Sequence, residues 1–200
     1  ALGSGFSHPA RALATFREEL IAGGRFLQAG DSAVNGIARW DGSGWRGMGS
    51  GFGPIGSAEL IYSLSVYDGG LVAGGEFSQA GGAAAANVAL WNGTAWSALG
   101  AGTDGPVLAL ADYEGGLVAG GTFESAGGSA AASVALWSGA RWDPLGAGIR
   151  RVDGTATVAA LVLFRGELIA SGDFDSAGTD RARNIARWDG SAWTPLAAGT

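Results

Sequence analysis

The chain has 200 residues and a formal net charge of −6 at pH 7, with 47% apolar and only 15% charged residues. This length and composition predict one domain or two small ones with a substantial core, and they exclude an intrinsically disordered chain. All 12 basic residues are arginines and form no basic stripe, which argues against nucleic acid and anionic membrane surfaces as partners.

Glycine is unusually frequent, with 38 residues, but it follows no Gly-X-Y period and only 5 prolines accompany it, which excludes collagen and a low-complexity linker. The absence of cysteine excludes a disulfide framework and cysteine-based zinc sites. The apolar run at residues 158–164 is far shorter than the ~20 residues of a membrane-spanning helix. No signal peptide is visible, although a start at Ala1 without Met leaves a removed leader open.

One unit is repeated four times along the chain. The segment GGLVAGGEFSQAGG at 69–82 returns as GGLVAGGTFESAGG at 115–128. A phenylalanine after the glycines and a pair of tryptophans recur with steps of 51, 46 and 51 residues, and the pairs use all 8 tryptophans. These landmarks are Phe26, Phe77, Phe123 and Phe174, and the pairs Trp40/Trp45, Trp91/Trp96, Trp137/Trp142 and Trp188/Trp193.

In chain order, each unit predicts four short strands. The first is an apolar alternation such as IYSLSVY at 61–67, and the second ends in glycines, as GLVAGG at 70–75. The third runs into the first tryptophan, as NVALW at 87–91, and the fourth begins at the second, as WSALGAG at 96–102. Between the third and fourth strands lie the turn sequences DGSG, NGTA, SGAR and DGSA, which favour tight hairpins.

Helical periodicity is absent, and four strands in a period of 46–51 residues are typical of a β-propeller blade. Leucine-rich repeats are about half as long, and a β-sandwich gives no reason for four copies. We therefore expect an all-β chain with four antiparallel four-stranded blades, at approximately 6–51, 52–102, 103–148 and 149–199.

The repeated residues are expected to be structural. Tryptophan beside a tight turn in every unit favours burial between neighbouring sheets over stacking on sugar rings. The paired glycines end a strand, where they let sheets approach closely. A phosphate-binding loop would need a helix after these glycines, and none is expected.

Variable loops are the expected ligand face. The five extra residues of the longer units lie between the fourth strand of one unit and the first strand of the next, in what we call the four–one connection. In a blade, this connection shares an edge with the two–three connection, which joins the second strand to the third. Loops on a rigid scaffold commonly carry binding. The candidate contacts for a protein or glycan are His8, Gln28, Asp31, Asn35, Gln79, Asp104, Glu124, Arg150, Arg151, Asp180, Arg181 and Arg183.

Little in the chain indicates catalysis, a cofactor or a metal. His8 is the single histidine, which argues against a metal centre and a Ser-His-Asp triad. The segment 173–180 only superficially resembles a calcium loop, because the central glycine and final glutamate of an EF-hand are missing. Asn92-Gly-Thr matches a glycosylation sequon, but a hairpin turn explains it. The remaining carboxylates Glu124, Asp173, Asp175 and Asp180 lie near the loops between second and third strands. We expect no enzyme; the alternative is a carboxylate-based hydrolase or lyase at the centre of the ring.

The landmarks resemble the kelch repeat and, more loosely, the propeller of the galactose oxidase central domain. In kelch units an apolar strand ends in Gly-Gly, and a hairpin carries Tyr and then Trp about seven residues on. Here Trp91 and Trp96 take those two positions, and Ser171 replaces the first glycine in the fourth unit. Bacterial repeats with AGG-x-F and ARWDGS-x-W look closer, which makes a secreted or cell-envelope location one option. Copper chemistry as in galactose oxidase would need a Tyr–Cys crosslink, and the chain has no cysteine.

Four blades leave open how the ring closes, because an open arc exposes the apolar faces of its end sheets. The first and fourth units share ELIA and IARWDGS, which suits a fourth unit packed on a first unit. The segment ALGSG at 1–5 also duplicates the end of a fourth strand. We expect two chains to form one eight-bladed ring, a homodimer; the alternative is a closed four-bladed ring.

The leading functional hypothesis is a non-catalytic module that binds a protein or glycan through the variable loops. The alternative is a purely structural, self-assembling propeller fragment, designed or excised from a longer array. Both rest on the fold and on loop position, since no motif names a ligand.

Overall fold

The computed structural model describes residues 2–54 and 59–196, and within these ranges every regular element is a β-strand. Four antiparallel four-stranded sheets, one per repeat, form the blades of a β-propeller fold, which confirms the predicted fold class. Ala1 and the predicted end of the fourth blade at residues 197–199 lie outside the described residues. The described ranges contain no helix long and apolar enough to span a membrane.

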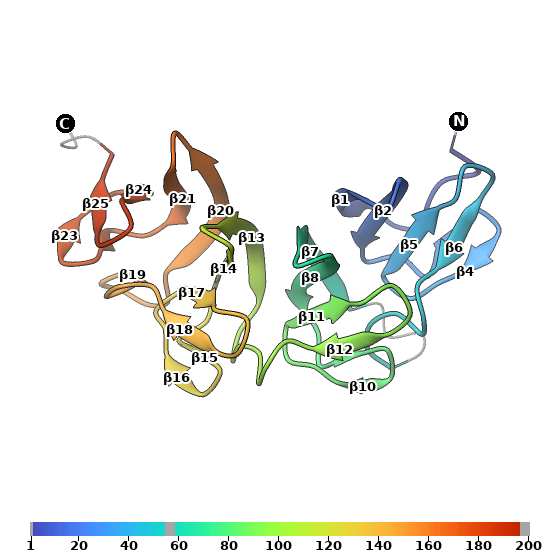
Figure 1. The fold of residues 1–200 in the computed structure, drawn as a ribbon, viewed down its shortest axis with the longest axis horizontal. Helices are drawn as coiled ribbons and strands as arrows, with labels where there is room; N and C mark the ends of the chain where they lie inside the picture. The colour runs from blue at the N-terminus through green and yellow to red at the C-terminus, as the bar shows by residue number, and fades with distance from the viewer. Residues whose placement is uncertain (1, 55–58, 197–200) are drawn as a thin grey trace. The chain divides into compact units, whose positions relative to one another are not determined.

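The four strands of each blade lie side by side in chain order (Figure 1). Blade 1 consists of β1 (Ala10–Phe16), β2 (Glu19–Gly24), β5 (Ile37–Trp40) and β6 (Trp45–Gly47). Blade 2 consists of β7 (Leu60–Tyr67), β8 (Gly70–Glu76), β11 (Val88–Trp91) and β12 (Trp96–Ala98). Blade 3 consists of β13 (Val107–Tyr113), β14 (Gly116–Gly121), β17 (Val134–Trp137) and β18 (Trp142–Pro144). Blade 4 consists of β20 (Thr157–Phe164), β21 (Glu167–Asp173), β24 (Ile185–Trp188) and β25 (Trp193–Pro195).

Tight turns fix the register of the blades. Asp68 and Gly69 join β7 to β8 with φ of 46° and 70°, and two positive φ angles are the requirement of a type I′ hairpin. The turn from β5 to β6 is held by Asp41, whose Oδ1 accepts hydrogen bonds from the backbone N–H groups of Ser43 and Gly44 at 2.9 Å each. The aspartate of the Asp-Gly sequence therefore stabilises the turn between the two strands with its own carboxylate.

Each two–three connection contains a small hairpin that the sequence analysis took for a loop. The hairpins are β3 (Gln28–Ala29) with β4 (Ser32–Ala33), β9 (Gln79–Ala80) with β10 (Ala83–Ala84), β15 (Ser125–Ala126) with β16 (Ser129–Ala130), and β22 (Ser176–Ala177) with β23 (Asp180–Arg181). The segment before each first strand pairs with the hairpin: Phe6 with Ala29, Phe52 with Ala80, Thr103 with Ala126, and β19 (Ile149–Arg150) with β22. The two–three and four–one connections thus share one edge of each blade, as expected.

The chain divides into two compact units, Ala1–Gly102 with blades 1 and 2, and Thr103–Thr200 with blades 3 and 4. In the first unit, Phe16, Ile21 and Ile37 of blade 1 share one buried cluster with Leu71 and Trp91 of blade 2. The second unit repeats this arrangement with equivalent residues: Tyr113, Val118 and Val134 of blade 3 with Leu168 and Trp188 of blade 4. Each unit therefore has a core between two neighbouring sheets.

Glycine at the end of the second strand brings neighbouring blades together. A Cβ added to Gly23 would lie 2.6 Å from Cγ2 of Ile61, the equivalent residue of the next blade's first strand. A Cβ on Gly120 would lie 2.5 Å from Cγ1 of Val158. Since real Cβ atoms do not approach so closely, only glycine fits opposite a β-branched residue at these positions.

Candidate functional site

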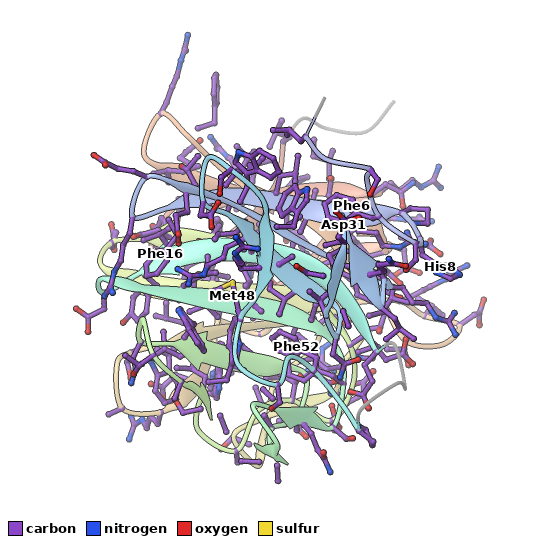
Figure 2. All side chains as sticks on the ribbon, turned by 90° about the vertical axis from the view of Figure 1, so that its right-hand side faces the viewer. Phe6, His8, Phe16, Asp31, Met48 and Phe52 are labelled. Atoms are coloured by element: carbon purple, nitrogen blue, oxygen red, sulfur yellow. The ribbon has the colours of Figure 1, made fainter. Side chains whose placement is uncertain are left out.

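One candidate region is the loop edge, the edge of each unit formed by the small hairpins and the four–one connections. In the first unit it carries His8, Gln28 and Asp31, all exposed, and Gln79, which is half-buried in β9. Figure 2 shows His8, before β1, on the side of the view opposite to Phe16 at the end of β1. The backbone N–H of Ser7 donates to the carbonyl oxygen of Gln28 at 3.0 Å, which fixes His8 beside the hairpin.

Asn35 was expected at the ligand face, but the structure corrects this interpretation. Its side chain is buried, with 7% of the residue exposed. The amide Nδ2 donates hydrogen bonds to the carbonyl oxygens of Phe52 and, at 3.3 Å, Gly53. Asn35 therefore attaches the connection to blade 2 onto blade 1 and is not available to a ligand.

Asp104, in the second unit, is exposed, but its carboxylate already has partners. The backbone N–H groups of Glu124 and Ser125 donate to Oδ1 at 2.9 Å each. Burial alone would raise the pKa of Asp104, yet the hydrogen bonds from Ser125 and Glu124 outweigh it and lower the pKa below its ordinary value. Asp104 holds the start of the 103–106 connection against its hairpin, as the hydroxyl of Ser7 does against Leu27 and Gln28.

All but one of the remaining candidate residues of the second unit line two hollows on the loop edge. One, of about 100 Å³, is lined by Glu124, Arg150 and Arg151. The other, of about 370 Å³, is lined by Asp180, Arg181 and the exposed Val152, among others. Arg183 is exposed and lines neither of these two hollows.

Two of the carboxylates considered for catalysis are engaged within the chain. Asp173 forms an ion pair with Arg151, and Asp175 accepts a hydrogen bond from the backbone N–H of Val152 at 2.9 Å. Among the described residues, no three His, Cys, Asp or Glu side chains gather in a way that could hold a metal ion. The carboxylates therefore order loops in this structure.

The second candidate region consists of two apolar sheet faces. We call the face that packs on the following blade the trailing face, and the face that packs on the preceding blade the leading face. On the trailing face of blade 4, Phe164 is 56% exposed, whereas the equivalent Phe16 of blade 1 is 6% exposed. Ile185 is 41% exposed, whereas its equivalents Ile37 and Val134 are fully buried.

The leading face of blade 1 is uncovered in the same way. Leu20 and Trp40 are half-buried, whereas the residues at the same repeat positions in blades 2 and 4 are buried, namely Leu71 and Leu168, and Trp91 and Trp188. Leu13, on β1, is 65% exposed. The sequence analysis expected exposed end faces but named none of these residues; aligning the repeats and asking which residues lack a neighbouring blade would have found them.

The tryptophans of the repeat are packed in pairs. Their ring centroids lie 5.4–5.6 Å apart in all four blades, and all except Trp40 are buried. Nε1 of Trp96 donates to the carbonyl oxygen of Met48 at 3.0 Å, and Nε1 of Trp45 donates to that of Leu2 at 3.1 Å. The segment at Leu2 thus contacts the second tryptophan of blade 1 in the same way as the segment at Met48, the end of blade 1, contacts the second tryptophan of blade 2.

Comparisons with known proteins place the fold but no activity. No protein-family profile matches the chain, and no curated protein matches it. It is similar to the computationally designed Ika8 protein, with a TM-score of 0.52 and 16% identity over 93% of this chain and 47% of Ika8. It is equally similar to the computationally designed Ika4 protein, with a TM-score of 0.52 and 16% identity over 93% of this chain and 94% of Ika4. The chain thus spans about half the length of Ika8, and at this identity the likeness shows the fold alone.

Proposed function

We propose that this chain is a non-catalytic structural scaffold that associates with itself through the uncovered faces of its terminal blades. The observation that carries the proposal is the exposure of Phe164, at a position where the equivalent phenylalanine of blade 1 is buried. Soluble proteins rarely leave a contiguous apolar sheet face open to water, so a partner surface is expected there. The similarity to two designed proteins of this fold is consistent with a structural role.

Native mass spectrometry and light scattering test the proposal. Wild-type protein is expected as a species of twice 19.8 kDa that survives dilution. Phe164→Asp is expected to shift it to a single chain, because a carboxylate would have to lose its water in the apolar contact. Val152→Asp is the matched control, since it changes an apolar residue of the loop edge that is even more exposed than Phe164, at 83% against 56%, and leaves the sheet face intact. A wild-type protein of 19.8 kDa at all concentrations with Phe164 accessible to solvent would contradict the proposal.

A second candidate is recognition of a protein or glycan at the loop edge. The observation in its favour is that Glu124, Arg150 and Arg151 line one hollow and Asp180 and Arg181 another, so that both signs of charge meet there. A glycan array and a pull-down with wild-type protein test it. Retention that is lost in Arg150→Ala/Arg181→Ala supports recognition at this edge, and retention unchanged by these substitutions argues against it.

A further inference from the structure

We propose that blade 4 of one chain docks head-to-tail on blade 1 of a second chain, with Ser171 opposite Ala10, so that two chains form one ring of eight blades. This inference rests on the self-association proposed above and names the two faces, their register and the partner. Three independent features of the described residues lead to it.

The first feature is a matched change of side-chain volume. Within each unit, a glycine faces a β-branched residue of the next blade: Gly23 faces Ile61, and Gly120 faces Val158. Blade 4 carries Ser171 at the glycine position, as its pairing with Ala160 on β20 shows, and its trailing face is uncovered. The position equivalent to Ile61 and Val158 in blade 1 is Ala10, paired with Gly24 on β2. A larger residue on blade 4 is therefore matched by a smaller residue on blade 1, as close packing requires.

The second feature is charge complementarity. Nη2 of Arg17, which follows β1, donates to the carbonyl oxygen of Asn92 in the three–four turn of blade 2 at 3.2 Å. Arg165 holds the equivalent position after β20, and its guanidinium stacks on Phe164 at 5.1 Å much as that of Arg17 stacks on Phe16 at 5.0 Å. The residue of blade 1 equivalent to Asn92 is Asp41. In the proposed contact, Arg165 therefore meets the carbonyl oxygen of Asp41 and lies near its carboxylate, whose Oδ2 also pairs with Arg46 at 3.2 Å.

The third feature concerns how far the contact extends across the sheets. Ile37 on a third strand is fully buried in the cluster that contains Trp91, also on a third strand. Because strands lie about 4.8 Å apart, a turn of about 90° between sheets separates the third strands by about 14 Å more than the first strands, and a turn of about 45° by only about 7 Å. The smaller separation is easier to fill, and the cluster that reaches both third strands also contains Met48 and Phe52 of the connection between the blades. The packing within a unit thus favours an eight-bladed ring over a four-bladed one.

The comparison with Ika8 is compatible with this count. This chain aligns over 93% of its length with 47% of Ika8 and equally well with 94% of Ika4, so similar designed proteins occur at about twice this length and at about this length. Two head-to-tail contacts, each between one trailing and one leading face, would close such a ring without an open end.

Engineered cysteines test the contact directly, because the chain has no cysteine of its own. In the equivalent pairs, the added Cβ of Gly23 and of Gly120 lies 3.1 Å from Cβ of Ile61 and of Val158, which is somewhat shorter than the about 3.5–4.5 Å of a disulfide, so a small outward relaxation of the two strands allows the bond. After air oxidation, Ala10→Cys/Ser171→Cys is expected to give a covalent two-chain species, on the order of tenfold more than a pair with Ala33→Cys, which lies exposed on the loop edge. The reduced chains are checked for wild-type unfolding midpoints.

The single variants and native masses separate the outcomes. Mixed Ala10→Cys and Ser171→Cys chains should crosslink, whereas Ser171→Cys alone should not; a crosslink of Ser171→Cys with itself means that blade 4 meets blade 4 and overturns the head-to-tail contact. A disulfide within one chain of 19.8 kDa means a four-bladed ring and overturns the second copy. A wild-type dimer without the 10–171 crosslink overturns the register but leaves self-association standing. A single chain without a crosslink contradicts both.

Discussion

Nε1 of Trp96 donates a hydrogen bond to the carbonyl oxygen of Met48, 3.0 Å away and 48 residues earlier in the chain. Both residues are buried, and the bond ties the end of blade 1 to the outer hairpin of blade 2. Trp193 and the carbonyl oxygen of Leu145 form the same bond in the second unit at 2.9 Å. Since the bond crosses from one sheet to the next, it stabilises the order of blades rather than any single blade.

Trp96→Phe is expected to lower the free energy of unfolding by about 0.5–1.5 kcal/mol, because the carbonyl oxygen of Met48 loses one of its two donors and keeps only the backbone N–H of Gly51 at 3.3 Å. Urea unfolding followed by circular dichroism measures the loss. Trp193→Phe should cost a similar amount. Arg46→Ala, an exposed change on the strand that begins at Trp45, should cost less than either.

Gly120→Ala tests the close approach of blades 3 and 4. The new Cβ would lie 2.5 Å from Cγ1 of Val158, so we expect destabilisation of about 1–3 kcal/mol from overpacking. The double variant Gly120→Ala/Val158→Ala should recover part of that loss relative to the sum of the single variants, which urea unfolding of all four proteins measures as a coupling energy. Strict additivity would show that the two residues do not compete for space.

Asp189 predicts a pH dependence of stability. The hydrogen bonds from the backbone N–H of Ala192 and from Ser191 lower its pKa from 3.8 to about 2. Because the folded-state pKa is the lower one, the stabilisation is present above pH 3.8 and is lost as the pH falls through about 2. Asp189→Asn keeps the acceptor, as Asn92 does in blade 2. The difference in free energy of unfolding between wild type and Asp189→Asn, measured with urea, should therefore be constant above pH 3.8 and decrease as the pH falls from 3.8 to about 2.

Asn35→Asp tests whether this buried side chain holds the connection between blades 1 and 2. The amide donates to two carbonyl oxygens, and an ionised carboxylate would instead face them without a proton to donate. We expect a loss of about 1–3 kcal/mol or more at pH 7, larger than for Asn35→Ala, the residue found at this position in blades 2 and 3. Equal stability of the two variants at pH 7 would contradict the assigned contact.

The candidate site was only partly predictable from sequence. Loop position correctly placed His8, Gln28 and Asp31 on an exposed edge, because hairpin connectivity alone decides which connections share an edge. It could not distinguish them from Asn35 and Asp104, whose polar groups bond to backbone 17 to 21 residues away. Polar residues in loops look alike in sequence. Only the tertiary structure shows whether such a side chain is free to contact a ligand or is hydrogen-bonded to a distant part of the chain.

The sequence by itself determined the blades: the alternating first strands, the Asp-Gly turns and the period of 51 and 46 residues act through contacts local to one repeat. Only the tertiary structure decided which faces are left open, because burial of Phe16 and exposure of Phe164 depend on whether another sheet lies against them. The same holds for Ser171 and Ala10. Their sizes are visible in the sequence, but their correspondence follows from the packing of Gly23 on Ile61 and of Gly120 on Val158.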